Sequence, residues 1–325
     1  MTTRAFAFSS ARFHFNASCE AIASLGSFRS SWKGQYCRSD RFKQLRSNAK
    51  RTVRKFTFEV SGSLKEHEGI EERKLEILVE EISVDTDVFK LVSKQGNKRS
   101  RRNVYYLDGA VNCVIGLPSE RDAVAFLDKF KSVLATKPGQ FRDELSVHSL
   151  IITHFGDDDH ASLESFVNSF PGTNIVATLE QRRKVSLALP KIAAECDWQI
   201  VRSELDVTDY GRGHLVQYLP GRDDSPFKDS LFACDTKSGI WYSGKLFGVD
   251  LDMGTTSLEP SQIESLRGAR REYFDNLQGI VEEDVSELEL TFDEPEILCP
   301  SYGPVISGSS LSNQILIDYI EWTTS

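Results

Sequence analysis

The pattern of apolar and polar positions in the middle of the chain predicts a hairpin followed by an amphipathic helix. Two β-rich runs flank Asp108 and Gly109, a dipeptide that favours a tight turn between antiparallel strands. Downstream, residues 123–134 place Phe126 and Phe130 at helical spacing on one face. The order strand, turn, strand, helix therefore opens this part of the chain.

Strands and helices alternate after this point, and a second β-rich region follows. The apolar runs predict strands at 147–153, 174–178, 198–201, 214–219, 230–234 and 239–243, with helices at 161–170, 179–196, 260–283 and 312–322. We expect a kink at Pro190 inside the second of these helices, because proline cannot donate a helical hydrogen bond. This order is typical of a single α/β sandwich, in which helices cover two sheets.

Composition separates the first 55 residues from the rest. They contain 12 Lys and Arg, two acidic residues and nine serines, as organellar transit peptides do. We therefore expect a disordered transit peptide over residues 1–55 and a folded body over residues 56–325. Chloroplast is the favoured destination and mitochondrion the alternative; a basic tail that binds nucleic acid is the competing interpretation.

The body is strongly acidic once this segment is set aside. It keeps 27 of the 39 basic residues and 46 of the 48 acidic ones, a formal net charge of −19. Such a charge repels phosphate backbones, so nucleic acid is not an expected partner. No run of about 18 apolar residues predicts a membrane span. The four body cysteines, Cys113, Cys196, Cys234 and Cys299, lack metal-site spacing and are expected in the core.

One basic island interrupts the acidic body. Residues 94–102 read KQGNKRSRR and predict a solvated hairpin tip. A contact site for an acidic partner is the alternative interpretation.

The stretch THFGDDDH offers the chemistry of a metal site. It follows an apolar run and contains His154, Asp157, Asp159 and His160, which are ligand types for zinc or non-haem iron. Acids just before a helix also cap its exposed amides, so capping explains them without a metal. The other body histidines, His67, His148 and His214, are interpreted as surface or packed residues.

Several segments, in order, resemble the N-terminal domain of flavodiiron proteins, particularly the cyanobacterial and plastid kind. THFGDDDH is similar to their first metal loop, and their opening hairpin resembles residues 103–109. Their second-half histidine loop resembles residues 218–232, their bridging-aspartate segment residues 240–248, and their last ligand turn residues 299–304. The resemblance spans about residues 75–323. It implies a metallo-β-lactamase αββα sandwich as one domain.

The differences from that family matter for the expected metal chemistry. The family's loop reads His-x-Glu-x-Asp-His, whereas this loop has one extra residue and no Glu. Arg222 or its acidic neighbours stand at the next His position, Lys245 at the bridging Asp and Tyr302 at the last His. We expect these replacements to leave at most one Fe or Zn ion and preferentially none; if Arg222 and Lys245 pair with Asp157 and Asp159, salt bridges fill the site. Tyr302 could donate a hydrogen bond where the ligand stood, and a purely structural role is the alternative.

The resemblance also bears on partners and function. No flavodoxin-like FMN domain follows, so a separate flavoprotein or a complete flavodiiron relative is the expected partner, and a dimer is compatible with this. The favoured function is a non-catalytic binding or regulatory role in the plastid. The alternatives are an oxidoreductase subunit that reduces O2 or NO with a separate flavoprotein donor, and a mononuclear metal-dependent hydrolase.

Overall fold

The computed structural model describes residues 53–54, 73–95, 98–137, 145–222, 225–249, 260–276 and 282–324. Contacts divide the chain into Met1–Lys50 and Arg51–Ser325, and every described residue belongs to the second unit. Most of the expected transit peptide therefore lies outside the described residues; its last part contributes Val53 and Arg54, which pair with the first long strand.

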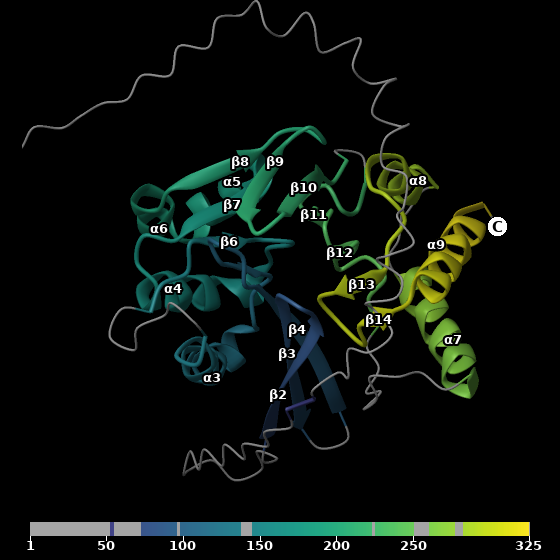
Figure 1. Ribbon diagram of the computed structural model, residues 1–325, viewed down its shortest axis with the longest axis horizontal. Coiled ribbons are helices and arrows are strands. Elements are labelled where there is room, and N and C mark those ends of the chain that lie inside the picture. The colour runs from purple at the N-terminus through teal and green to yellow at the C-terminus, as the bar shows by residue number, and fades with distance from the viewer. Residues whose placement is uncertain are drawn as a thin grey trace, which may run out of the picture. The chain divides into compact units, whose positions relative to one another are not determined.

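Two sheets face each other in this unit (Figure 1). The strands of sheet A, in spatial and chain order, are β1 (Val53–Arg54), β2 (Arg73–Ser83), β3 (Thr86–Gln95), β4 (Lys98–Leu107), β5 (Cys113–Ile115), β6 (Ser149–Ile151), β7 (Asn174–Thr178) and β8 (Trp198–Val201). Its first half is antiparallel, and β5 to β8 pair in parallel.

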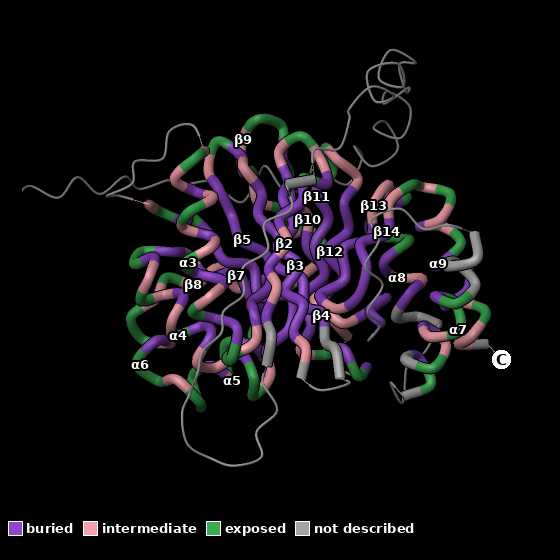
Figure 2. Tube along the Cα trace, turned by 90° about the horizontal axis from the view of Figure 1, so that it is seen from below, coloured by how far each residue is buried: buried purple, intermediate pink, exposed green. Residues whose placement is uncertain are grey.

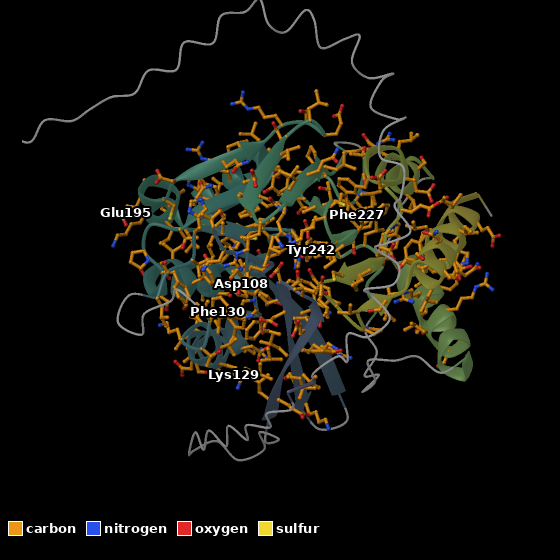
Figure 3. The ribbon with its side chains drawn as sticks, in the orientation of Figure 1. Asp108, Lys129, Phe130, Glu195, Phe227 and Tyr242 are labelled. Atoms are coloured by element: carbon orange, nitrogen blue, oxygen red, sulfur yellow. The ribbon has the colours of Figure 1, made fainter. Side chains whose placement is uncertain are left out.

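Sheet B is the second β-rich region of the sequence. Its strands in spatial order are β14 (Ile306–Ser307), β13 (Ile297–Pro300), β12 (Ile240–Gly244), β11 (Leu231–Asp235), β10 (His214–Pro220) and β9 (Val207–Gly211). Only β12 and β13 pair in parallel within it. Tyr242 lies between the two sheets (Figure 3), in a buried cluster with Tyr105 of sheet A.

Helices cover the outer face of each sheet, which makes four layers. On the side of sheet A lie α3 (Ala123–Leu134), α4 (His160–Ser169), α5 (Leu179–Ala188) and α6 (Pro190–Glu195). On the side of sheet B lie α7 (Pro260–Asn276), α8 (Glu282–Thr291) and α9 (Ser309–Thr324). Figure 2 shows the buried strands of both sheets in the centre, with exposed residues gathered on the helices and loops around them. The αββα sandwich expected from the sequence is confirmed.

The break between α5 and α6 follows the proline rule. The first helix ends at Ala188, Leu189 leaves the helical conformation, and Pro190 begins the next helix at a position where its missing N–H is not needed. No helix among the described residues has the length and apolarity that crossing a membrane requires.

Candidate functional site

The THFGDDDH loop leaves sheet A at the end of β6 and leads into α4. His154 and Asp159 are buried within it, whereas Asp157 and Asp158 are exposed. His160 is half-buried, and its ring lies against Phe155 with 5.1 Å between the ring centres. The loop therefore turns one histidine and one carboxylate inward, and leaves its other histidine and its other two carboxylates half-buried or exposed.

A third inward side chain, Arg102, reaches this pair from β4. Its guanidinium forms an ion pair with Asp159 and donates a hydrogen bond to Nε2 of His154 at 3.1 Å. It also lies over the ring of Tyr302, 5.5 Å from the ring centre. We call Arg102, His154, Asp159 and Tyr302 the His154 cluster.

The neighbour of Arg102 explains how β4 reaches the cluster. Asn103 donates its backbone N–H to Ser301 and its side-chain amide to the carbonyls of Pro300 and Gly303, at 2.8, 2.9 and 2.8 Å. These bonds fasten β4 of sheet A to the loop that follows β13 of sheet B. Because adjacent strand residues point to opposite sides, the same clamp directs Arg102 toward the loop after β6.

His154 is held in its neutral form by these contacts. Burial lowers the pKa of His154 well below its usual value, and the charges of Arg102 and Lys245 lower it further. A neutral imidazole has one donor and one acceptor nitrogen. Since Arg102 can only donate, Nε2 is the acceptor; it also lies 3.3 Å from the hydroxyl of Tyr302, which therefore donates to it. The lone pair that would bind a metal is thus taken up by protein donors.

The carboxylate of Asp159 is occupied in the same way. One oxygen accepts from Arg102, and the other accepts the backbone N–H of Gly156 at 2.9 Å. Within the described ranges, no three His, Cys, Asp or Glu side chains converge as a metal-binding group. The flavodiiron resemblance implies iron at this position; here the two inward ligand candidates, His154 and Asp159, are both hydrogen-bonded to Arg102.

The replaced-ligand positions contribute unequally to this arrangement. Tyr302 donates to His154, which is one of the two roles that the sequence left open. Lys245 follows Gly244, the last residue of β12, and is near enough to His154 to lower its pKa. Arg222 is half-buried in the loop after β10. The cation bound to Asp159 is Arg102, a residue that the sequence did not single out.

The burial of Arg102 shows that the interpretation of residues 94–102 as a solvated hairpin tip was wrong in part. These residues do form the β3–β4 hairpin, but Arg101 and Arg102 are 6% and 7% exposed and are not part of a solvated tip. Arg101 lies on the face of β4 that carries Tyr105, and Arg102 on the opposite face that carries Val104. The hairpin register, which composition does not reveal, moves both arginines inward.

No protein-family model and no curated protein matches the sequence. The core resembles the 1–254 fragment of a diflavin flavoprotein from Nostoc sp. PCC 7120, at 19% identity and a TM-score of 0.64, over 77% of this chain and 97% of that fragment. The chain has the metallo-β-lactamase-like fold of the flavodiiron core.

Two further solved structures place the same core inside longer proteins. They are the flavodiiron core of Flv1 from Synechocystis sp. PCC6803 (20% identity, TM-score 0.62, 77% of this chain) and rubredoxin oxygen:oxidoreductase from Desulfovibrio gigas (15%, 0.64, 76%). This chain spans 61% of the length of each. At these identities the similarity establishes the fold.

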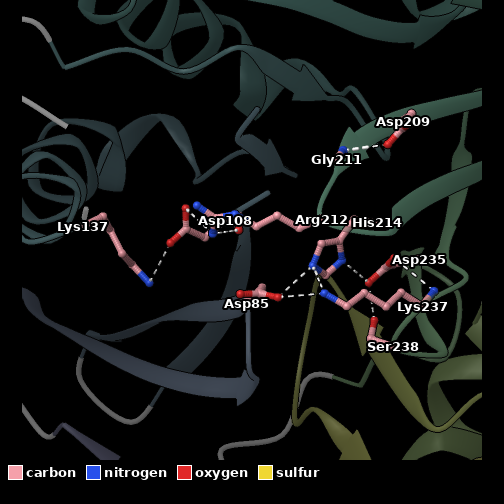
Figure 4. Close-up of polar contacts among 10 residues, drawn as sticks. All are labelled: Asp85, Asp108, Lys137, Asp209, Gly211, Arg212, His214, Asp235, Lys237 and Ser238. Atoms are coloured by element: carbon pink, nitrogen blue, oxygen red, sulfur yellow. Dashed lines mark hydrogen bonds and ion pairs between the residues drawn. The ribbon is translucent and has the colours of Figure 1, made fainter. Parts of the chain in front are cut away.

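A second buried histidine, His214, lies near the other end of β12, where the sequence predicted a surface or packed residue without a functional role. His214 of β10 contacts Asp235 through Nδ1 at 2.9 Å and Asp85 through Nε2 at 3.0 Å (Figure 4). Lys237 contacts both Asp85 and His214 at 3.0 Å, and Ser238 donates to Asp235. We call these five residues the His214 cluster. An isolated histidine at a strand start gave no sequence signal, since its partners lie 21 and 129 residues away.

Proposed function

We propose that this chain is a flavodiiron-fold protein with a degenerate metal site that acts by binding or regulating a partner in the plastid. The observation that carries the proposal is the His154 cluster. Arg102 and Tyr302 donate to Nε2 of His154, and Arg102 neutralises Asp159. A permanent guanidinium takes the role of a metal cation in balancing the buried carboxylate.

The same geometry disfavours the two catalytic alternatives. A mononuclear hydrolase needs three protein ligands around one ion with an open position for water. An oxidoreductase subunit of this fold needs ligands for a redox metal. His154 and Asp159 are both engaged with Arg102, while Asp157 is exposed and His160 packs against Phe155.

The proposed partner is a complete flavodiiron relative or a separate flavoprotein. The basis for this is the shared fold, because the solved structures that the chain resembles are flavodiiron and flavoprotein cores.

Metal content and oxygen uptake test the proposal together. We expect full-length protein, produced with added iron and zinc, to hold well under one ion per chain by elemental analysis. It should consume no O2 with a reduced flavoprotein donor alone. Two irons per chain, or steady O2 or NO reduction with that donor, would contradict the proposal and support the oxidoreductase alternative. One tightly held zinc with ester hydrolysis would support the hydrolase.

The plastid assignment has its own test, because nothing in the His154 cluster bears on it. We expect residues 1–55 fused to a fluorescent protein to direct it into chloroplasts. A matched fusion that begins at residue 56 should stay outside them. Import into mitochondria by the first fusion would support the other destination.

A further inference from the structure

Exposed apolar side chains lie beside β9, the edge strand of sheet B. Leu290 at the end of α8 is 87% exposed, Leu205 68%, Val207 50% and Leu215 42%. The segments that carry them meet at Gln217, which pairs with Val207 across the β9–β10 ladder and donates to the carbonyls of Glu204 and Thr291. Exposed aliphatic side chains gathered on neighbouring segments form a surface of the kind that contacts other proteins. We call it the Leu290 patch.

The rim of the Leu290 patch is predominantly acidic. The two segments that supply it, 202–212 and 287–296, contain eight acidic residues and two basic ones, the exposed Arg202 and Arg212 at the two ends of the first segment. The acids crowd each other locally: burial raises the pKa of Glu289, and repulsion from Glu294 raises it further. A partner that brings positive charge to this rim would relieve that repulsion.

A small cavity opens beside the patch. It measures about 180 Å³ and is lined in part by Gln217, Cys234 and Thr291. Small-molecule sites usually reach about 300 Å³ or more. The cavity is therefore too small for a typical metabolite and has the size to accept one or two side chains of a docked segment.

We infer that the Leu290 patch docks a protein segment that presents lysines or arginines around one or two apolar anchor residues. The apolar anchors pack on the exposed aliphatic side chains, a basic side chain enters the cavity that Gln217 and Asp293 line, and the other basic residues meet the acidic rim. Charge complementarity selects this occupant over a second copy of the chain, because two acidic rims would repel each other. The inference concerns a different surface from the His154 cluster, so its failure and that of the proposed function have separate readouts.

Three synthetic peptides test the docking with the full-length protein. The first is an amphipathic helix with leucines on one face and lysines on the other; the second replaces the lysines by glutamates, and the third replaces the leucines by serines. Fluorescence anisotropy at low salt measures binding. We expect the first peptide to bind at least tenfold more tightly than either control, and to weaken as salt screens the rim charges.

Site variants locate the contact. Leu205→Ser with Leu290→Ser should weaken the first peptide about tenfold, and Glu204→Lys with Glu289→Lys should weaken it more at low salt. These side chains are exposed, so thermal melts should show that both variants fold as the wild type does. The matched control is Leu179→Ser with Leu187→Ser on α5, where two leucines of 68% and 78% exposure flank Arg182 and Arg183. It should leave binding unchanged.

Several outcomes would overturn the inference. Equal binding of the serine peptide would mean unspecific attraction to an acidic protein, and equal loss in the α5 control would move the contact elsewhere. Self-association that is measured by sedimentation and abolished by the Leu205 and Leu290 changes would identify a second copy as the occupant.

Discussion

Two buried histidines lie at opposite ends of β12 and are held by opposite kinds of partner. His154 is near Lys245, just past the end of the strand, and accepts hydrogen bonds from Arg102 and Tyr302. His214 is near the turn before the strand and lies between the carboxylates of Asp85 and Asp235. Each cluster joins sheet A to sheet B through charged groups of the protein itself.

The difference teaches that residue type alone does not define a metal site. His154 lies in a loop with three aspartates, which is the composition of a ligand loop, yet its acceptor nitrogen faces a guanidinium. His214 has two carboxylates within 3.0 Å, yet both its nitrogens are engaged by them. In both places the positive charge that balances buried carboxylates comes from side chains. Replacing these side chains one at a time should lower stability by amounts that differ from one variant to the next.

The largest effect is expected from Arg102→Ala. It leaves the carboxylate of Asp159 buried without its cation, which typically costs about 3–5 kcal/mol of unfolding free energy. Urea denaturation at pH 7 measures the loss. Arg183→Ala on α5 is the control, because the Arg183 side chain is 73% exposed beside Glu180 and should change stability by well under 1 kcal/mol. Comparable losses in both variants would argue against a stabilising role of the cluster.

His214→Ala should cost less, about 2–3 kcal/mol. Asp235 is fully buried and loses its histidine partner, but it keeps the Ser238 hydroxyl and the backbone N–H of Lys237. Urea denaturation is again the measurement, and the exposed His148→Ala serves as the control. Wild-type stability in His214→Ala would show that the cluster contributes nothing to joining the sheets.

The pH dependence of stability should reflect the protonation of His154. Its pKa is lowered in the folded state, so below about pH 6.5 the unfolded chain binds a proton that the folded chain does not. This contribution to stability is therefore complete above that pH and is lost as the pH falls, by up to about 1.4 kcal/mol per unit. We expect His154→Gln to flatten the curve between about pH 6.5 and 5. His148→Gln should follow the wild type, and a steep curve in His154→Gln would contradict the assignment.

The smallest effect is expected from Lys237→Met. Lys237 contacts Asp85 and His214, but its side chain is 40% exposed, so solvent screens the interaction to about 1 kcal/mol or less. Burial tends to raise the pKa of Asp85, but hydrogen bonds from His214 and Lys237 outweigh it and leave that pKa below its usual value. NMR titration of Asp85 should show a partial upward shift in Lys237→Met. An unchanged Asp85 titration would remove Lys237 from the cluster.

Local elements were predictable where a short pattern decides them. The predicted bounds of α3, β7 and β8 match the structure, because apolar periodicity and flanking turns define each within a few residues. The strand β3 was not predicted. It is held by long pairing with β2 and β4, and this tertiary context is not visible in its own ten residues.

The candidate site was predictable only in part, for the same reason. The sequence and the flavodiiron resemblance pointed to the loop with His154, and they gave a hydrogen bond from Tyr302 as one of two alternatives. They did not point to Arg102, because it lies 52 residues before His154 and its direction depends on strand register and on the clamp formed by Asn103. A charged residue in a basic run is usually solvated. Arg102 is an exception, and only the register of the β3–β4 hairpin reveals it.

Cobalt titration tests most directly whether protein groups occupy the position at which a metal would bind. Co²⁺ gives visible absorption when protein ligands replace its water, so titration of the full-length wild type reports whether His154 and Asp159 are open to a cation. The comparison protein carries Arg102→Ala, Arg222→His, Lys245→Asp and Tyr302→His, which removes the guanidinium and restores ligand types. We predict no bound-cobalt spectrum for the wild type and a saturable one for this variant. A saturable spectrum from the wild type, lost in His154→Gln, would contradict the account.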